Sequence, residues 1–180
     1  MTVFPRSAFG APVVTAPGLV LCGLEARDVD GLLENDTDPE TAARFGWEPS
    51  DPAPLQENRW VEETARMWRD GERAVFAVRD SLDGPYLGTV EARQRPCPPG
   101  HDGGEPVVEL SWTVRPSQRG RRIAQRAVCG LVTWCGELGI SEVWARVEVT
   151  NPASLRVAAA AGFERVTEAE GWVYLCAATR

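Results

Sequence analysis

Residues 107–127, VVELSWTVRPSQRGRRIAQRA, contain the elements that decide the fold. Residues 107–114 read as a strand, and residues 123–138 place apolar side chains every three or four positions, as a helix does. Gly120 and four arginines lie between the two segments: Arg115, Arg119, Arg121 and Arg122. A strand, a tight turn and a long helix predict a crossover unit, in which residues 141–149 form the next, parallel strand.

The rest of the chain predicts a single α/β domain. Strand-like and helix-like segments alternate in the order β-α-α-β-β-β-α-β-α-β, and no repeat or linker divides them. We therefore expect residues 19–180 to form a mixed central sheet flanked by helices. Residues 1–18 are rich in Pro, Gly and Ala, and we expect them to be a flexible lead-in.

Composition and charge restrict the function. The chain has 180 residues, a formal net charge of −7 and a pI near 4.9, and all of its basic side chains are arginines. An acidic protein lacks the broad basic face that binds nucleic-acid backbones, so we expect no nucleic-acid partner. No apolar run is long enough for a membrane helix, and the first residues lack the apolar core of a secretory signal. The five cysteines form no C-x-x-C pair, which favours a cytoplasmic protein with reduced thiols.

His101 is the only histidine, and it lies in a loop of Pro and Gly residues. No cysteines or carboxylates accompany it at the spacing of metal ligands, so we expect no metal site. No G-x-S-x-G elbow is present, which argues against a Ser-His-Asp mechanism. We therefore expect a surface histidine.

The turn between residues 114 and 123 suits an anion. The start of a helix presents unpaired N–H groups and the positive end of the helix dipole, which together bind phosphate groups. The turn is neither a Walker loop nor a dinucleotide fingerprint, because G-x-x-x-x-G-K-[ST] and G-x-G-x-x-G are both missing. From these residues alone, a hydrated arginine surface stays open as the alternative.

Several motifs together resemble the GNAT superfamily of N-acetyltransferases. RGRRIA, residues 119–124, is similar to the [QR]-x-x-[GA]-x-[GA] pyrophosphate loop of that superfamily. NPASLRVAAAAGFERV, residues 151–166, is similar to the N-x-x-S-x-r-v-x-e-k-x-G-F segment of the subgroup that includes ribosomal-protein N-terminal acetyltransferases. VELSWTV and YLGTVEA match two strands of the same subgroup. The resemblance covers residues 19–178 and implies the GNAT fold.

The resemblance implies that acetyl-CoA is the co-substrate and that its pyrophosphate binds the N–H groups of the turn. It places six residues at the phosphates: Arg119, Gly120, Arg121, Arg122, Ile123 and Ala124. It also implies that Val114 pairs with the pantetheine arm, which behaves like an extra strand. Arg122 stands where the family usually has glycine or alanine. We expect helical backbone angles at Arg122, with crowding that affects cofactor affinity.

Asn151 and Pro152 predict the start of a helix, with Asn151 as its N-cap. The family uses this asparagine to hydrogen-bond the cofactor arm, and the two roles are compatible. The resemblance implies that Ser154 is the candidate to protonate the departing thiolate. Many other members use a tyrosine one turn further along, where this chain has Ala158.

Glu109 is the candidate general base. It stands in an otherwise apolar strand, where a solvent-facing position would be the ordinary explanation. An amine is protonated at neutral pH and must lose a proton before it attacks a thioester. An ordinary carboxylate is a weak base for an ammonium group, so a perturbed environment or a water relay is required. The resemblance to a strand glutamate of the family favours the catalytic role.

The expected function is transfer of an acetyl group from acetyl-CoA to a primary amine by direct attack in a ternary complex. The acceptor stays open between a peptide or protein N-terminus and a small amine, and Trp47 and Trp60 are candidates to line its cleft. A protein of the same fold that senses CoA or an amine ligand without turnover is the alternative. The sequence leaves the oligomeric state open, a homodimer included.

Overall fold

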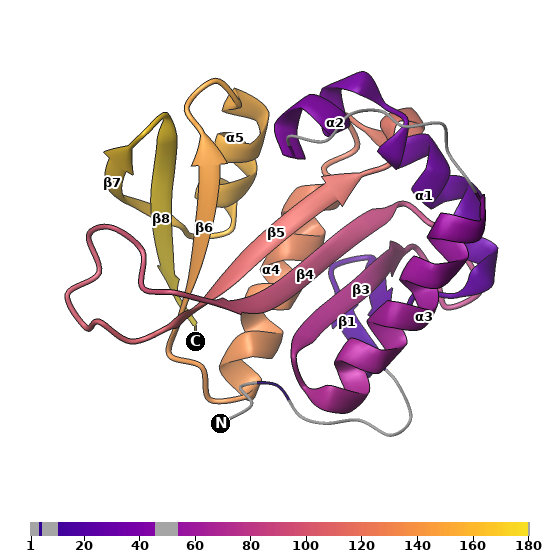
Figure 1. The fold of residues 1–180 in the computed structure, drawn as a ribbon, viewed down its shortest axis with the longest axis horizontal. Coiled ribbons are helices and arrows are strands. Elements are labelled where there is room, and N and C mark those ends of the chain that lie inside the picture. The colour runs from indigo at the N-terminus through magenta and orange to yellow at the C-terminus, as the bar shows by residue number, and fades with distance from the viewer. Residues whose placement is uncertain (1–3, 5–10, 46–53, 180) are drawn as a thin grey trace.

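The computed structural model describes residues 4, 11–45 and 54–179, and Trp47 lies outside these ranges. The described residues form one mixed sheet with helices on both faces (Figure 1), as the sequence predicted. The strands are β1 (Val14–Ala16), β2 (Leu19–Cys22), β3 (Arg73–Arg79), β4 (Gly88–Arg95), β5 (Val107–Val114), β6 (Glu142–Glu148), β7 (Glu164–Ala169) and β8 (Trp172–Ala178). The α-helices are α1 (Val29–Asp36), α2 (Pro39–Phe45), α3 (Pro54–Asp70), α4 (Ile123–Glu137) and α5 (Pro152–Ala160), and residues 26–28 and 116–118 form short 3-10 helices.

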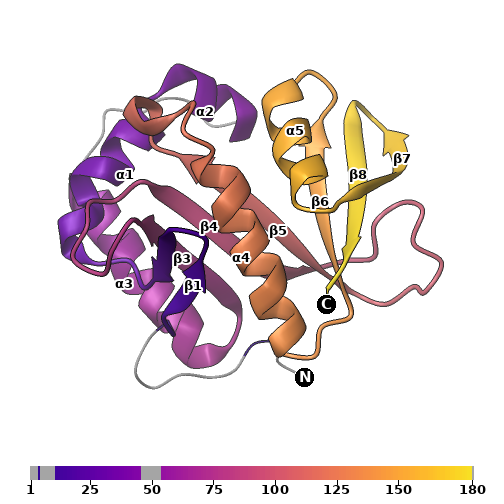
Figure 2. The ribbon, with the colours of Figure 1, turned by 180° about the vertical axis from the view of Figure 1, so that it is seen from behind.

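The strand order is β1-β2-β3-β4-β5-β6-β8-β7, and every neighbouring pair is antiparallel except β5 and β6. α4 connects these two parallel strands, which confirms the predicted crossover. Helices α4 and α5 cover one face of the sheet, as the view from behind shows (Figure 2), and α1 and α3 cover the other. The class is therefore α/β.

The expectation of a flexible lead-in is wrong for residues 14–16. They form the edge strand β1, which pairs with β2. Val14 and Ala16 point into the core, and α4 packs so closely on Ala16 that a Cβ on Gly130 would lie 2.5 Å from the Ala16 Cβ. The small residues that resembled a linker in the sequence permit this close packing.

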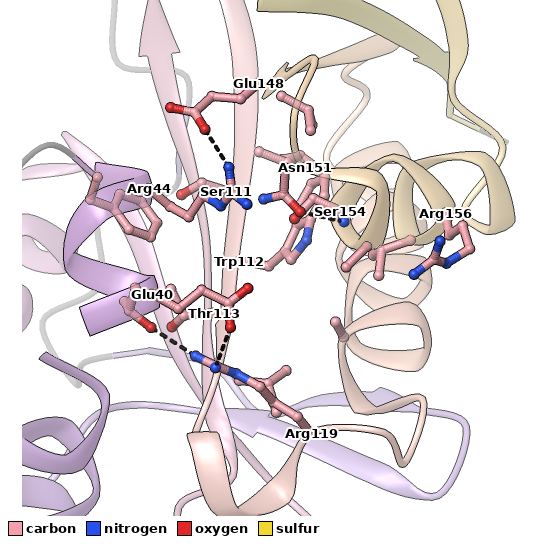
Figure 3. Close-up of a pocket in the computed structure, with 18 of the residues that line it drawn as sticks. Glu40, Arg44, Ser111, Trp112, Thr113, Arg119, Glu148, Asn151, Ser154 and Arg156 are labelled. Atoms are coloured by element: carbon pink, nitrogen blue, oxygen red, sulfur yellow. Dashed lines mark hydrogen bonds and ion pairs between the residues drawn. The ribbon is translucent and has the colours of Figure 1, made fainter. Parts of the chain in front are cut away.

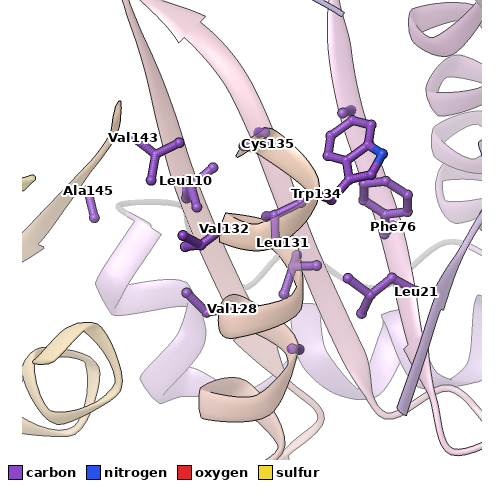
Figure 4. Packing of buried hydrophobic residues seen from close by; sticks show 14 of the residues in the cluster. Leu21, Phe76, Leu110, Val128, Leu131, Val132, Trp134, Cys135, Val143 and Ala145 are labelled. Carbon is purple, nitrogen blue, oxygen red and sulfur yellow. The ribbon is translucent and has the colours of Figure 1, made fainter. Parts of the chain in front are cut away.

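The main core lies between α4 and the sheet (Figure 4). The apolar stripe of α4 that the sequence indicated is buried against the strands, with Leu131 and Cys135 fully covered. Trp134 packs edge-on against Phe76 of β3, with the ring centroids 5.1 Å apart. This core fixes α4, and hence the position at which α4 begins.

Successive residues of β5 face opposite sides of the sheet. Leu110 is buried on the side of α4, whereas Ser111 and Thr113 face a cavity that Leu32 of α1 and Trp60 of α3 also line. The period of two along a strand thus gives β5 one side in the core and one side in an open space between helices. Glu109 belongs to the second side.

A buried ion pair ties the first helical turn of the chain to β3. Arg79 is fully buried, and its Nη2 donates to Asp28 Oδ2 at 2.7 Å. Asp28 Oδ2 also accepts the N–H of Glu25 at 2.8 Å. Burial is the first cause of a raised pKa for Asp28, and the Glu25 and Arg79 contacts oppose it.

We predict that Asp28→Ala lowers the free energy of unfolding by about 3–5 kcal/mol, because it removes the close counter-ion of the buried Arg79 and leaves only the exposed Glu25, whose Oε1 lies 3.8 Å from Arg79 Nη2. Urea denaturation followed by circular dichroism measures the loss. Asp30→Ala, at an exposed position two residues away, is the matched control and should change stability by less than about 0.5 kcal/mol. A loss below about 1 kcal/mol for Asp28→Ala would contradict this account of the pair.

Arg122 adopts a left-handed backbone conformation immediately before α4, with φ 57° and ψ 25°. The expectation of helical angles at this position is therefore wrong. A Cβ in this region approaches its own carbonyl group, which is why such positions favour glycine. A glycine at this position would therefore relieve backbone strain, in addition to any question of space.

We predict that Arg122→Gly raises the free energy of unfolding by about 0.5–1 kcal/mol. Relief of left-handed strain gains roughly 1–2 kcal/mol, and the greater freedom of glycine in the unfolded chain offsets about half of it. Arg121→Gly is the control, because Arg121 is not among the positive-φ residues and should lose stability or stay unchanged. Equal effects of the two substitutions in thermal unfolding would refute the prediction.

Candidate active site

A cavity of about 870 Å³ opens where β5 and β6 separate (Figure 3). The two strands share only one paired position, Glu109 with Trp144, and they diverge beyond it. The second half of β5, the turn before α4, the end of β6 and the start of α5 form the walls, and α2 lies across the opening. The residues brought together here include every catalytic and cofactor-binding candidate of the sequence except Arg121.

The edge of β5 at Val114 is available to an extended ligand. The N–H of Arg115 donates to Leu87 O at 2.9 Å, and Val114 is opposite Gly88 in the β4–β5 pairing. In an antiparallel ladder this pattern makes Val114 a non-hydrogen-bonded partner, so its own N–H and C=O point toward β6. Because β6 has turned away at this level, these groups face the cavity.

The turn from Gly120 to Ala124 presents main-chain N–H groups to the same cavity. The first bond of α4 runs from Arg126 N to Arg122 O at 3.2 Å, and residues 120–125 donate no N–H to any acceptor among the described residues. Gly120, with φ 79°, and Arg122 are both left-handed and flank Arg121. Such alternation curves successive N–H groups into a concave site for an anion, next to the positive end of the α4 dipole.

Four arginines lie between β5 and α4, and two of them, Arg115 and Arg119, form ion pairs with carboxylates of α1, of α2 and of Asp38 just before α2. Arg119 Nη2 lies 2.5 Å from Asp38 Oδ2, and its Nη1 lies 3.0 Å from Glu40 Oε2. Burial disfavours the charge of Asp38, but the hydrogen bonds from Arg119 and Thr41 outweigh it and lower the pKa of this carboxyl. The Arg119 guanidinium thus joins the turn to α2.

Arg115 makes the equivalent contact with α1. Its Nε lies 2.5 Å from Glu34 Oε2, and the N–H of Ser117 donates to Glu34 Oε1 at 2.9 Å. Contacts with Ser117 come first among those that lower the pKa of Glu34. Arg121 hydrogen-bonds Gln118, and neither Arg121 nor Arg122 forms an ion pair with a described residue. Of these two side chains, only Arg122 lines the cavity.

Asn151 caps α5, as predicted: its Oδ1 accepts the N–H of Ser154 at 3.0 Å. The amide Nδ2 of Asn151 has no partner among the described residues, so the capping role leaves a donor for a ligand. Ser154 lies beside it on the cavity wall, and its hydroxyl is likewise without a described partner. Ala158, where the tyrosine of other members would lie, is completely buried.

Glu109 faces the cavity from β5, near the point where the strands separate. Its Oε1 accepts from Arg93 Nη2 at 2.8 Å and lies 3.6 Å from Arg95 Nε. Its Oε2 has no partner among the described residues. Sequence reasoning identified the carboxylate and missed both arginines, because the alternation of β4 shows only that residues 93 and 95 share a face.

A second cavity, of about 650 Å³, adjoins the first on the side of α1 and α3. The two share the lining residues Phe45, Arg93, Ser111, Trp112 and Thr113. Trp60 lines this space, and the Arg73 guanidinium lies 5.6 Å from its ring centroid. Arg73 in turn pairs with Glu91 at 2.5 Å. An acceptor bound here would approach the first cavity beside Glu109.

Arg44 and Glu148 were not found from the sequence. Arg44, on α2, donates to Glu148 of β6 at 2.7 Å and to Thr150 Oγ1 at 3.0 Å, and so spans the opening of the cavity (Figure 3). More than one hundred positions separate the partners, and no local pattern marks either residue. Together with Arg119, this contact holds α2 over the opening at both of its ends.

His101 is 18% exposed, so it lies at the surface with most of its ring covered. Its ring packs edge-on against Trp144. Within the described ranges, no group of three His, Cys, Asp or Glu side chains could hold a metal ion. No described helix is long and apolar enough to cross a membrane.

Comparisons with known structures agree with this architecture. RimJ from Mycobacterium smegmatis, solved in complex with CoA-disulfide, has a TM-score of 0.71 at 16% identity, over 97% of this chain and 90% of that chain. Ribosomal-protein-S5-alanine acetyltransferase from Vibrio fischeri has a TM-score of 0.72 at 17% identity, over 93% of this chain and 97% of that chain. Spermidine N-acetyltransferase from Vibrio cholerae, in complex with CoA and spermine, has a TM-score of 0.68 at 16% identity, over 90% and 96% respectively.

These identities are low, and the likenesses concern the fold. No curated protein matches the sequence. The family model described as acetyltransferase (GNAT) domain, however, matches residues 19–164, which is most of the chain. That range includes β5, the turn, α4 and the Asn151–Ser154 segment. The chain therefore belongs to the GNAT family of acetyltransferases.

Proposed function

We propose that the protein transfers an acetyl group from acetyl-CoA to a primary amine, by direct attack of the amine within a ternary complex. The observation that carries the proposal is the pairing of an open strand edge at Val114 with unpaired N–H groups at residues 120–124, in one cavity. An extended pantetheine arm suits the first feature, and a pyrophosphate suits the second. The GNAT membership of the chain supports the same assignment.

The chain's residues fit acetyl-CoA in shape and chemistry. A cavity of about 870 Å³ is large enough for an extended ligand that projects beyond it. In this assignment Gly120, Arg121, Arg122, Ile123 and Ala124 bind the phosphates chiefly through their N–H groups. Arg119 contributes through its backbone position in the turn, since its guanidinium already contacts Asp38 and Glu40. Asn151 Nδ2 donates to the cofactor arm.

Acetyl-CoA supplies an activated acyl group, and the chain's residues position it and handle the protons. The Oε2 oxygen of Glu109 accepts a proton from the acceptor ammonium, directly or through a water molecule. The Arg93 contact on Oε1 fixes the direction in which Oε2 points. Main-chain N–H groups of β5 that face the cavity polarise the thioester carbonyl, and Ser154 Oγ protonates the thiolate as it leaves.

The acceptor enters through the second cavity in this proposal. Its walls include the aromatic ring of Trp60 and charged side chains such as Glu91 and Arg73, which form an ion pair with each other. A small amine and a peptide N-terminus both fit a space of about 650 Å³. An experiment is therefore needed to distinguish a small amine from a peptide N-terminus as the acceptor.

Release of free thiol from acetyl-CoA, measured against a panel of small amines and peptides with free N-termini, tests the proposal. Turnover with at least one acceptor supports an acetyltransferase. Thermal stabilisation by CoA, without turnover on any acceptor, would instead support a sensor. The ion pairs of Glu109 with Arg93 and Arg95 are the observation that favours this alternative, because a paired carboxylate is a weaker base. The absence of any stabilisation by CoA would refute both functions.

We predict that Glu109→Gln lowers kcat roughly 100-fold while the affinity for acetyl-CoA changes little, because glutamine keeps the contact with Arg93 and cannot accept the proton. Steady-state kinetics and calorimetric titration with CoA separate the two effects. Glu105→Gln, at an exposed loop position, is the control. An unchanged kcat in Glu109→Gln would remove Glu109 from the mechanism.

We predict that Arg122→Gly leaves the affinity for CoA unchanged or improves it, because glycine keeps the N–H group and adopts the left-handed conformation without strain. Calorimetric titration gives the dissociation constant of each variant. Arg121→Gly should behave in the same way if N–H groups dominate the site. A loss of about tenfold or more for Arg122→Gly would mean that the guanidinium itself holds a phosphate.

A further inference from the structure

The loop at residues 96–106 brings the only histidine of the chain against a cysteine. His101 Nδ1 lies 3.5 Å from Cys97 Sγ. The imidazole packs edge-on against Trp144 of β6, with ring centroids 5.4 Å apart, and is 18% exposed. Cys97 is half-buried, and neither residue lines the two cavities described above. This is a separate cluster on the surface of β6.

The contacts of the imidazole indicate the tautomer of its neutral form. The N–H of Gly103 donates to Nδ1 at 3.1 Å, so Nδ1 is the unprotonated nitrogen. The ring proton is then on Nε2, which lies 3.2 Å from Glu142 Oε1. That carboxylate oxygen also accepts from Trp144 Nε1 at 2.9 Å. A thiol, an imidazole base and an orienting carboxylate follow one another, which is the arrangement that activates a nucleophile.

The Cys97 thiol has three acceptors within reach, and only one of them is a base. Its Sγ lies 3.4 Å from the carbonyl oxygen of His101 and 3.7 Å from that of Pro98, in addition to Nδ1. A carbonyl oxygen can accept a hydrogen bond from the thiol, but it is too weak a base to take the thiol proton. Transfer to Nδ1 releases the N–H of Gly103, which is exposed and can turn to water.

The other four cysteines provide an internal comparison. Burial raises the pKa of Cys22 and of Cys129, and it raises the pKa of Cys135 to about 12. Burial, followed by the charge of Glu142, raises the pKa of Cys176 to about 11. These thiols are poor nucleophiles at neutral pH. Cys129 is half-buried like Cys97 and has no histidine beside it, so it is the matched reference.

We propose that Cys97, His101 and Glu142 form a reactive-thiol site that exchanges with small-molecule disulfides, independently of acetyl transfer. His101 Nδ1 takes the thiol proton, and the Cys97 sulfur attacks one sulfur of the disulfide. A new disulfide forms between Cys97 and one half of the reagent, while the bond between the two reagent sulfurs breaks. The departing thiolate takes the proton from His101, so atoms and charge balance. Glu142 acts as a positioning residue.

Native protein treated with dithiodipyridine, an uncharged disulfide with a coloured leaving group, tests the proposal. One thiol per chain should react in a fast phase, and peptide mapping should identify it as Cys97. Cys97→Ser should abolish this phase, and Cys129→Ser should keep it. Within the wild-type protein, a Cys97 that reacts no faster than Cys129 would overturn the proposal without recourse to any variant.

His101→Gln should slow the fast phase at least about tenfold, because glutamine fills similar space without a basic nitrogen. An unchanged rate in this variant would exclude the imidazole from the site. Glu142→Gln should slow the reaction to a lesser degree, since it retains an oxygen for Nε2 while removing the charge. Circular dichroism and thermal unfolding identify any variant in which the loop has been disturbed. In such a variant Cys97 would react faster through exposure, which is the opposite of the predicted change.

Discussion

The divergence of β5 and β6 is the constraint on which the site depends. Parallel strands normally satisfy each other's main-chain groups along their length, yet these two pair at a single position and then separate. The separation leaves N–H and C=O groups of β5 unpaired beside a long helix whose own first N–H groups are unpaired. Both sets need partners, and one extended, phosphorylated molecule can satisfy both. The core beneath α4 fixes the helix, and with it the distance between the two sets.

The arginine-rich turn serves the structure as much as a ligand. Arg115 and Arg119 contact carboxylates on α1 and α2, so about half of the positive charge is neutralised within the chain. These contacts, with Arg44 on Glu148, join α1 and α2 to the turn before α4 and to the end of β6 across the opening (Figure 3). Partly exposed pairs of this kind contribute modestly to stability. Their larger effect is geometric, because they hold α2 where it lines the cavity.

The sequence predicted those features whose signals are local. The stripe of α4, the crossover to β6 and the Asn151 cap depend on periodicity or on neighbouring residues, and all are present. β1 was missed because close packing on Gly130 requires the small residues that a linker also contains. The Arg44–Glu148 pair and the separation of the strands depend on residues far apart in the chain, and no pattern of one sequence records them. The contact of the His101 ring with Trp144 was missed for the same reason, since Trp144 is distant in sequence.

The backbone conformation of Arg122 changes the interpretation of this arginine, which stands where the family pattern has a small residue. Judged by volume, an arginine in place of a small residue implies crowding at the phosphates. Its left-handed conformation gives a different reason for the small residue, since glycine adopts these angles without strain. Ile123, next to Arg122, is anchored in the core, and Gly120 has a second left-handed conformation two residues before it. The N–H groups of residues 120–124 are unpaired with this arginine present, so in the proposed function the guanidinium is an addition to an anion site made of main-chain groups.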